Sequence, residues 1–114
     1  MAITLYHTGT EYTSNAITLL RGSVSDITSV GVYHNTNPNT IPLVSDFITV
    51  TLANGTLNPP DALAIPGEID VVALIGPKIG ADVNLSSPGN YQRWVIVKTA
   101  TQDLIRATDT VTIL

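Results

Sequence analysis

The stretch GNYQRWVIVKTATQDLIRATDTVTIL, residues 89–114, decides the fold of this 114-residue chain. It contains two strand-like runs, Tyr91–Lys98 and Asp109–Leu114, with a polar break at residues 99–108 between them. Successive side chains of a strand point to opposite faces, and the Pro-Gly pair at 88–89 supplies a tight turn directly before the first run. We therefore predict that the two runs pair antiparallel, with the break forming the hairpin connection.

The rest of the chain repeats this pattern of short strands between turns. Asn-, Pro- and Gly-containing segments separate the runs, and sustained helical spacing is absent apart from one candidate turn at Pro60–Ile65. About seven strands at this spacing predict one all-β domain, residues 1–114, folded as an antiparallel β-sandwich. The additional runs are Ile3–Tyr6, Ala16–Leu20, Thr28–His34, Asp46–Leu52 and Ile69–Ile75.

The core assignment depends on the single tryptophan. A tryptophan on a central strand of a sandwich most often lies in the core, and the alternative is an exposed anchor for a partner. If Trp94 is not in the core, the opposite face of its strand, with Arg93, Val95 and Val97, must be. The residues that we predict to be buried are Val50, Val71, Trp94 and Val95.

Composition and charge argue against several classes of function. The formal net charge is −4, and the five Lys and Arg residues are scattered, so the chain lacks the basic cluster that nucleic-acid binding needs. An acidic domain gains nothing at an anionic membrane, and no apolar run approaches the roughly 18 residues of a membrane span. There are no cysteines and no visible signal peptide, so we expect synthesis in a reducing cytoplasm.

No catalytic constellation is visible in the sequence. His7 and His34 are the only histidines, and neither has a nucleophile or an orienting acid at a suggestive spacing. Glu68 and Asp70 share one strand face and form a possible calcium half-site, for which a solvated strand start is the alternative. We expect no catalytic residue, no cofactor and no metal.

The C-terminal third resembles the ending of small Ig-like domains in the virion proteins of tailed bacteriophages. The matching residues are Pro88-Gly89, Tyr91, Trp94, Val95, Val97 and Thr110–Ile113, and the segment 26–38 resembles an early strand of such modules. This resemblance implies an Ig-like sandwich with an N-terminal arm over residues 1–15. It also implies a capsid decoration protein, or a head–tail connector or tail component, that binds the major capsid protein or other virion subunits in many copies or as a homo-oligomer.

Two segments are candidate partner interfaces. In the first, Ile3, Leu5 and Tyr12 could anchor an arm on a neighbour, or Ile3 and Leu5 could form the first strand of the sandwich. The second, HNTNPNT at residues 34–40, could be a recognition loop or only a polar connection, and its candidates are His34, Asn35, Asn37 and Asn39. A carbohydrate- or cell-surface-binding module, using end loops with Tyr6, Tyr12 and Tyr33, is the alternative from another class.

Overall fold

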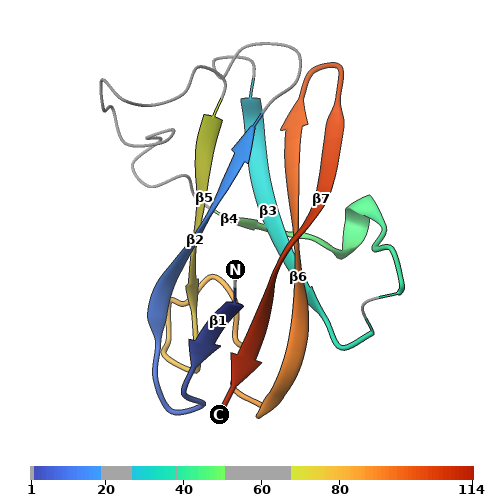
Figure 1. Cartoon of the computed structure of the whole chain (residues 1–114). Helices are drawn as coiled ribbons and strands as arrows, with labels where there is room; N and C mark the ends of the chain where they lie inside the picture. Colours follow the sequence, from blue (N-terminus) through green and yellow to red (C-terminus); the bar gives the residue numbers. More distant parts are fainter. Residues whose placement is uncertain (1, 19–26, 38, 51–67) are drawn as a thin grey trace.

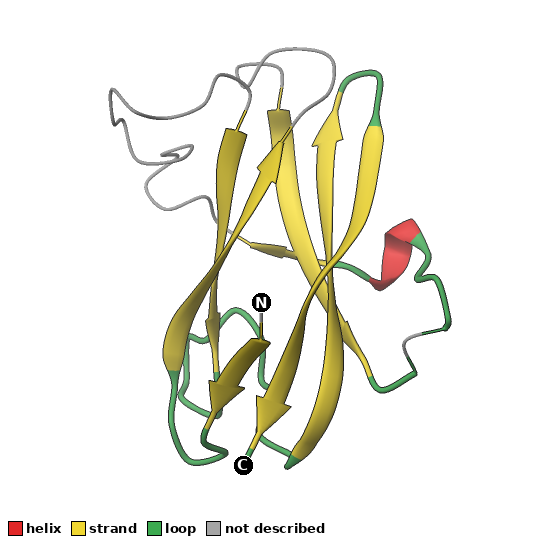
Figure 2. Ribbon diagram, in the orientation of Figure 1, coloured by secondary structure: helices red, strands yellow, loops and turns green. Residues whose placement is uncertain are grey.

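The computed structural model describes residues 2–18, 27–37, 39–50 and 68–114, with only the backbone described at 14–18 and 68–70. The predicted turn at Pro60–Ile65 lies outside the described residues. Seven strands and one turn of 3-10 helix follow one another along the chain (Figures 1 and 2). They are β1 (Ala2–Leu5), β2 (Glu11–Thr18), β3 (Ile27–Asn35), η2 (Val44–Asp46), β4 (Ile48–Val50), β5 (Glu68–Ile75), β6 (Gly89–Thr99) and β7 (Asp103–Ile113).

The strands form two sheets that face each other. The larger sheet has the order β1-β7-β6-β3-β4, and the smaller one pairs β2 with β5 (Figure 1). All pairs are antiparallel except β1 with β7, which run parallel. The row β7-β6-β3-β4 matches strands G, F, C and C′ of a variable-type immunoglobulin domain, opposite a sheet that contains strands B and E. The predicted all-β, Ig-like sandwich of about seven strands is confirmed.

The predicted pairing of the two C-terminal runs is also confirmed, although the connection is much shorter than expected. β6 and β7 pair from Gly89↔Ile113 to Lys98↔Asp103, so most of the polar break at 99–108 is strand. The turn itself is closed by Thr99, whose N–H donates to the Gln102 carbonyl and whose hydroxyl accepts from the Gln102 N–H. The Thr110–Ile113 end of β7 is not a sheet edge, because β1 pairs with its other side there.

The core lies between the two sheets and consists mainly of valine, whose stiff branched side chain suits a pleated surface. Val50, Val71 and Val95 are buried there, as predicted. The prediction for Trp94 is wrong, because Trp94 is half-buried on the outer face of β6 while its neighbours Arg93 and Val95 face inward. The buried cluster comprises Leu5, Val30, Val32, Val50, Val71, Ala73, Ile75, Val83, Val95, Val97, Val111 and Ile113.

Close backbone approach fixes the position of the edge strand β4 beside β3. Gly31 pairs with Thr49 in this ladder, and a Cβ added to Gly31 would lie 2.8 Å from the Ile48 carbonyl oxygen. Real Cβ atoms do not come so near to a carbonyl oxygen, so this site requires glycine. The described part of β4 has three residues, Ile48–Val50.

Candidate functional site

The N-terminal candidate residues lie partly in the core and partly on the surface. Leu5 on β1 is only 4% exposed and belongs to the buried cluster, and Ile3 packs against that cluster. Tyr12, at the start of β2, is 72% exposed. The segment expected as an arm or as a first strand thus supplies β1 and the first part of β2, and Tyr12 is the candidate among these three that presents a large apolar surface to solvent.

The second group of candidates separates into one inward-facing residue and a polar turn. Asn35, Asn37 and Asn39 form a chain of Asx turns, in which the N–H of Asn37 donates to Asn35 Oδ1 and the N–H of Asn39 donates to Asn37 Oδ1. The Asn35 amide also donates to the Thr40 carbonyl, so the turn is held by its own side chains. His34 belongs to a different environment, because its ring contacts Arg93.

Arg93 is the center of a polar cross-link between the two sheets. Its side chain is fully buried. The Nη2 group donates to Thr13 Oγ1 on β2 at 2.6 Å, and the Nε–H donates to His34 Nε2 on β3 at 3.0 Å. The Thr13 hydroxyl in turn donates to the Ala73 carbonyl on β5. We call Thr13, His34 and Arg93 the polar cross-link; it connects β2, β3 and β6.

The place of this cross-link in the fold is informative. Tyr91, near the start of β6, donates from its hydroxyl to the Ser87 carbonyl four residues upstream, which is the tyrosine corner of Ig-like domains. In immunoglobulins, the second cysteine of the inter-sheet disulfide comes two residues after this tyrosine. Here that position is Arg93, and its hydrogen bond to Thr13 runs from strand F to strand B, where the disulfide would run.

A β-bulge accompanies the inward orientation of Arg93. The β6–β7 register shifts between Gln92↔Thr110 and Trp94↔Ala107, so two residues of β7 lie opposite Arg93. Side chains bond backbone groups around the irregularity. The Gln92 amide donates to the carbonyls of Arg93 and Asp109, and the Thr108 hydroxyl donates to the Arg93 carbonyl.

Burial controls the ionisation of the polar cross-link. Desolvation, reinforced by the nearby charge of Arg93, lowers the pKa of His34 from 6.5 to about 3. Desolvation also lowers the pKa of Arg93 to about 10, while the Asp109 carboxylate acts in the opposite direction, so the guanidinium stays charged at neutral pH. Because His34 Nε2 accepts a hydrogen bond from Arg93, the neutral ring carries its proton on Nδ1, which is buried without a hydrogen-bond partner among the described residues.

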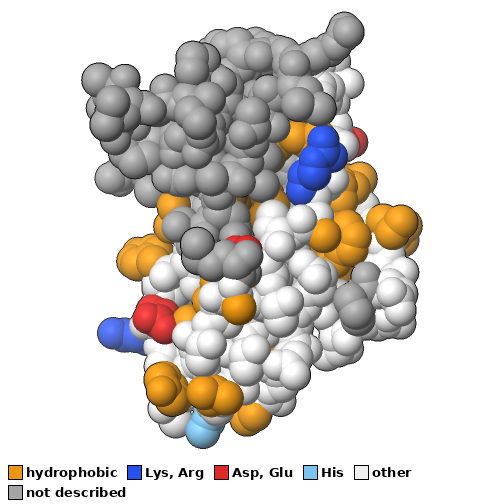
Figure 3. Space-filling view, in the orientation of Figure 1, with side chains coloured by type: hydrophobic (Ala, Val, Ile, Leu, Met, Phe, Trp, Pro, Cys, Tyr) orange, Lys and Arg blue, Asp and Glu red, His pale blue; other side chains and the backbone are white. Residues whose placement is uncertain are grey.

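Exposed aliphatic side chains occur in the connection between β3 and β4 and at Ile48, the first residue of β4. Ile41 is 72% exposed, Leu43 69%, Val44 38% and Ile48 45%. We call residues 41–48 the apolar loop. Figure 3 shows hydrophobic side chains on the right of the molecule, where η2 lies in Figure 1.

Local interactions hold the apolar loop in place. Pro42 is buried, and the N–H of Leu43, directly before η2, donates to the carboxylate of Asp46, the last residue of η2. The Phe47 ring lies 6.1 Å from the Tyr33 ring, centroid to centroid, in a tilted arrangement. The loop therefore presents aliphatic side chains on a backbone with tertiary support.

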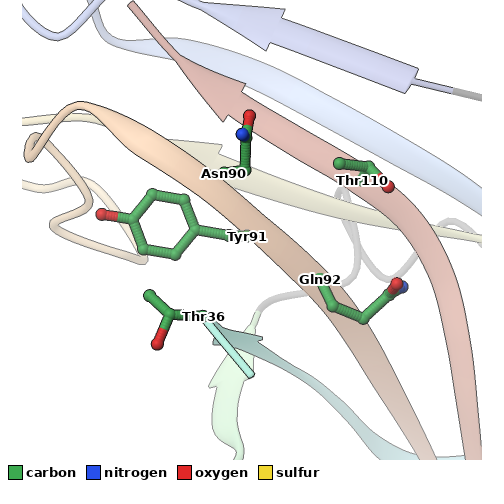
Figure 4. A pocket seen from close by; sticks show the side chains of 5 residues that line it. All are labelled: Thr36, Asn90, Tyr91, Gln92 and Thr110. Atoms are coloured by element: carbon green, nitrogen blue, oxygen red, sulfur yellow. The ribbon is translucent and has the colours of Figure 1, made fainter. Parts of the chain in front are cut away.

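A small hollow opens beside the start of β6 (Figure 4). Its volume is about 120 Å³, and the Tyr91 ring lines it together with four polar residues. Three of its side chains already make internal hydrogen bonds: Tyr91 to Ser87, Gln92 to two carbonyls, and Asn90 as acceptor from Thr112. The lining residues are Thr36, Asn90, Tyr91, Gln92 and Thr110.

Each histidine contacts another group of the protein within the described part of the chain. His7 Nδ1 lies 2.8 Å from the Leu114 carbonyl oxygen, and His34 is engaged with Arg93. The described residues contain no group of three or more His, Cys, Asp or Glu that could hold a metal ion. The side chains of Glu68 and Asp70, the possible calcium half-site, lie outside the described part of the chain.

The fold and site together define an Ig-like β-sandwich whose sheets are connected by buried polar side chains. Comparison with protein family models, with curated proteins and with solved structures finds no match for this chain. Within the described ranges, no helix is long and apolar enough to span a bilayer.

Two features of the site were not found by sequence reasoning. Arg93 was placed on the alternative core face, but its partners lie 59 and 80 residues away in the chain, so no local signal indicates the cross-link. The apolar loop had a weak signal. Ile41, Leu43 and Val44 follow a polar turn and surround Pro42 without strand alternation, which is unusual for core residues.

Proposed function

We propose that this protein is a non-enzymatic structural protein of a tailed-phage virion that decorates the capsid and stabilises the major capsid lattice. The resemblance of the C-terminal third to virion Ig-like domains suggests the setting. The observation that carries the proposal is the apolar loop, because exposed aliphatic residues held in one conformation are typical of protein-contact surfaces.

The internal organisation supports a structural role over a catalytic one. A decoration protein must remain folded while its surface binds a neighbour, and the polar cross-link and the tyrosine corner both restrain this sandwich internally. The two histidines contact other groups of the chain, so neither is paired with a nucleophile in the described residues. Many-copy binding then makes modest single contacts sufficient.

A head–tail connector or tail component would use the same kind of surface. Location on the particle separates these roles. Purified virions of the phage that encodes the chain can be split into heads and tails, and each fraction probed with antibody against this protein. Signal at many copies per head supports decoration, signal at the neck or tail favours the alternative, and absence from both fractions contradicts the proposal.

One observation favours a second candidate, a carbohydrate-binding module. The hollow at the start of β6 combines a tyrosine ring with neutral amides and hydroxyls, which suits sugar hydroxyl groups (Figure 4). Its weakness is that Tyr91, Gln92 and Asn90 already use hydrogen-bonding groups internally. A screen of the purified protein against immobilised glycans tests it, and binding that Gln92→Ala abolishes would support it.

A further inference from the structure

We infer that the apolar loop is the docking element, and that its partner is an uncharged, apolar hollow on a protein subunit other than this chain. This inference rests on the proposed function, because the subunit is taken to belong to the virion. The inference specifies which surface binds, which chemistry that surface recognises, and that each single contact is weak.

The charge distribution defines the partner's chemistry. Asp46 is the only charged residue in the segment 35–50, and its carboxylate accepts a hydrogen bond from the Leu43 N–H. The centre of the surface is therefore aliphatic and neutral. The exposed amides of Asn37 and Asn39 come from the adjoining turn, which the Asn35–Thr40 hydrogen bond ties to the start of the loop. An apolar centre with a polar border is the usual anatomy of a protein–protein contact.

Two other occupants fit less well. The hollow at the start of β6, a candidate seat for the loop of a second copy, is small, about 120 Å³, and most of its polar groups already form hydrogen bonds within the chain. A membrane surface is normally recognised by clusters of Lys and Arg, and residues 34–50 contain neither.

The size of the surface sets the strength of the contact. The four exposed aliphatic residues present on the order of 400 Å², a typical area for the largest apolar patch of a monomer. A stable one-to-one interface needs about 800 Å² from each partner. The apolar loop alone is thus too small for a tight binary complex, and we expect firm binding only where several contacts act together, as on a lattice.

The experiment compares Leu43→Asp with Ile79→Asp. Leu43 is 69% exposed in the apolar loop, whereas Ile79 is fully exposed in the connection between β5 and β6, so the same change of charge is made at two sites. Capsids of the encoding phage, assembled without this protein, are mixed with wild type and each variant, and the bound fraction is measured by sedimentation. Melting midpoints confirm that both variants are folded.

We expect Leu43→Asp to weaken capsid binding about tenfold or more, because the variant loses an apolar contact and would have to bury a carboxylate in the interface. Ile79→Asp should change binding less than twofold. Benzoylphenylalanine at position 43 should crosslink to a capsid subunit, and the same probe at position 79 should not. Binding by wild type and Leu43→Asp alike would overturn this inference and leave the proposed function standing. No binding by wild type would overturn both.

Other occupants give distinguishable results. Crosslinking of position 43 only to further copies of this chain would make the loop a self-association surface. Sedimentation with vesicles of phosphatidylcholine and phosphatidylserine, lost in Leu43→Asp, would make it a membrane contact. Either result would overturn the assignment of a capsid subunit as the partner.

Discussion

His34 should make the stability of this protein sensitive to mild acid. The pKa of its imidazole is about 3 in the folded protein and 6.5 when the side chain is in water, as in the unfolded chain. Between these two pH values the unfolded chain therefore binds a proton that the folded chain does not bind. The stabilising contribution of neutral His34 is therefore complete above pH 6.5 and is lost as the pH falls from 6.5 toward 3.

The size of the effect follows from the linkage slope. Well between the two pKa values, each pH unit changes the free energy of unfolding by about 1.4 kcal/mol for one group. Because the slope is only half as large at pH 6.5 itself, lowering the pH from 6.5 to 4.5 should remove roughly 2 kcal/mol. A domain of this size is stable by roughly 5–15 kcal/mol, so the loss is a large share. The main cause is that burial removes water from the charged imidazolium. The positive charge of the Arg93 guanidinium, whose Nε lies 3.0 Å from His34 Nε2, adds to this effect.

Urea unfolding at pH 7.0, 6.0, 5.0 and 4.5, followed by circular dichroism, measures this loss. His34→Gln keeps an oxygen that can accept the Arg93 Nε–H but does not titrate, so its stability should be nearly flat over the window. His7→Gln, which changes the exposed histidine beside the Leu114 carbonyl, should keep the wild-type slope. The reasoning is refuted if His34→Gln retains the full pH dependence, or if His7→Gln removes it.

Three further substitutions test the packing of the sandwich by urea unfolding. Arg93→Ala breaks a buried network and should lower the free energy of unfolding by roughly 3–5 kcal/mol. The double variant Arg93→Met with His34→Leu should recover much of this loss, because it replaces the buried polar groups by apolar ones. A loss below about 1 kcal/mol in Arg93→Ala would contradict a stabilising role for the network. Gly31→Ala drives a methyl group into the Ile48 carbonyl and should cost roughly 1–3 kcal/mol, whereas an unchanged midpoint would show that β4 moves freely. Leu5→Ala should cost roughly 2–5 kcal/mol if β1 is part of the core, and an unaltered midpoint would return residues 1–15 to the role of an arm.

The strands were predictable because their signals are local. Alternation in Tyr91–Lys98 lies within eight residues, and β6 contains the whole run. The prediction of a tight turn at Pro88-Gly89 is wrong, because Gly89 is already the first residue of β6 and pairs with Ile113. The position of Trp94 was not predictable from the same pattern, since both faces of β6 carry large apolar residues. Burial of Ile96 on the outer face and of Val95 on the inner face shows that hydropathy alone could not separate them.

The candidate site was less predictable because it depends on long-range contacts. A charged residue such as Arg93 is rarely buried without partners, so its inward orientation becomes reasonable only when Thr13 and His34 are known to meet it. The parallel pairing of β1 with β7 has the same origin, since it joins opposite ends of the sequence. The exposure of the apolar loop was not predictable for another reason. Aliphatic residues are normally assigned to the core, and whether they are exposed depends on their position in the tertiary structure.

The polar cross-link also changes which condition the sandwich depends on. A disulfide between strands B and F needs an oxidising compartment, and this chain contains no cysteine. Hydrogen bonds from Arg93 to Thr13 and His34 connect strands F, B and C whatever the redox potential, because none of these groups is oxidised or reduced in making them. These hydrogen bonds depend instead on a neutral His34 imidazole. The sandwich therefore needs no oxidising surroundings, but it does need surroundings that are not strongly acidic.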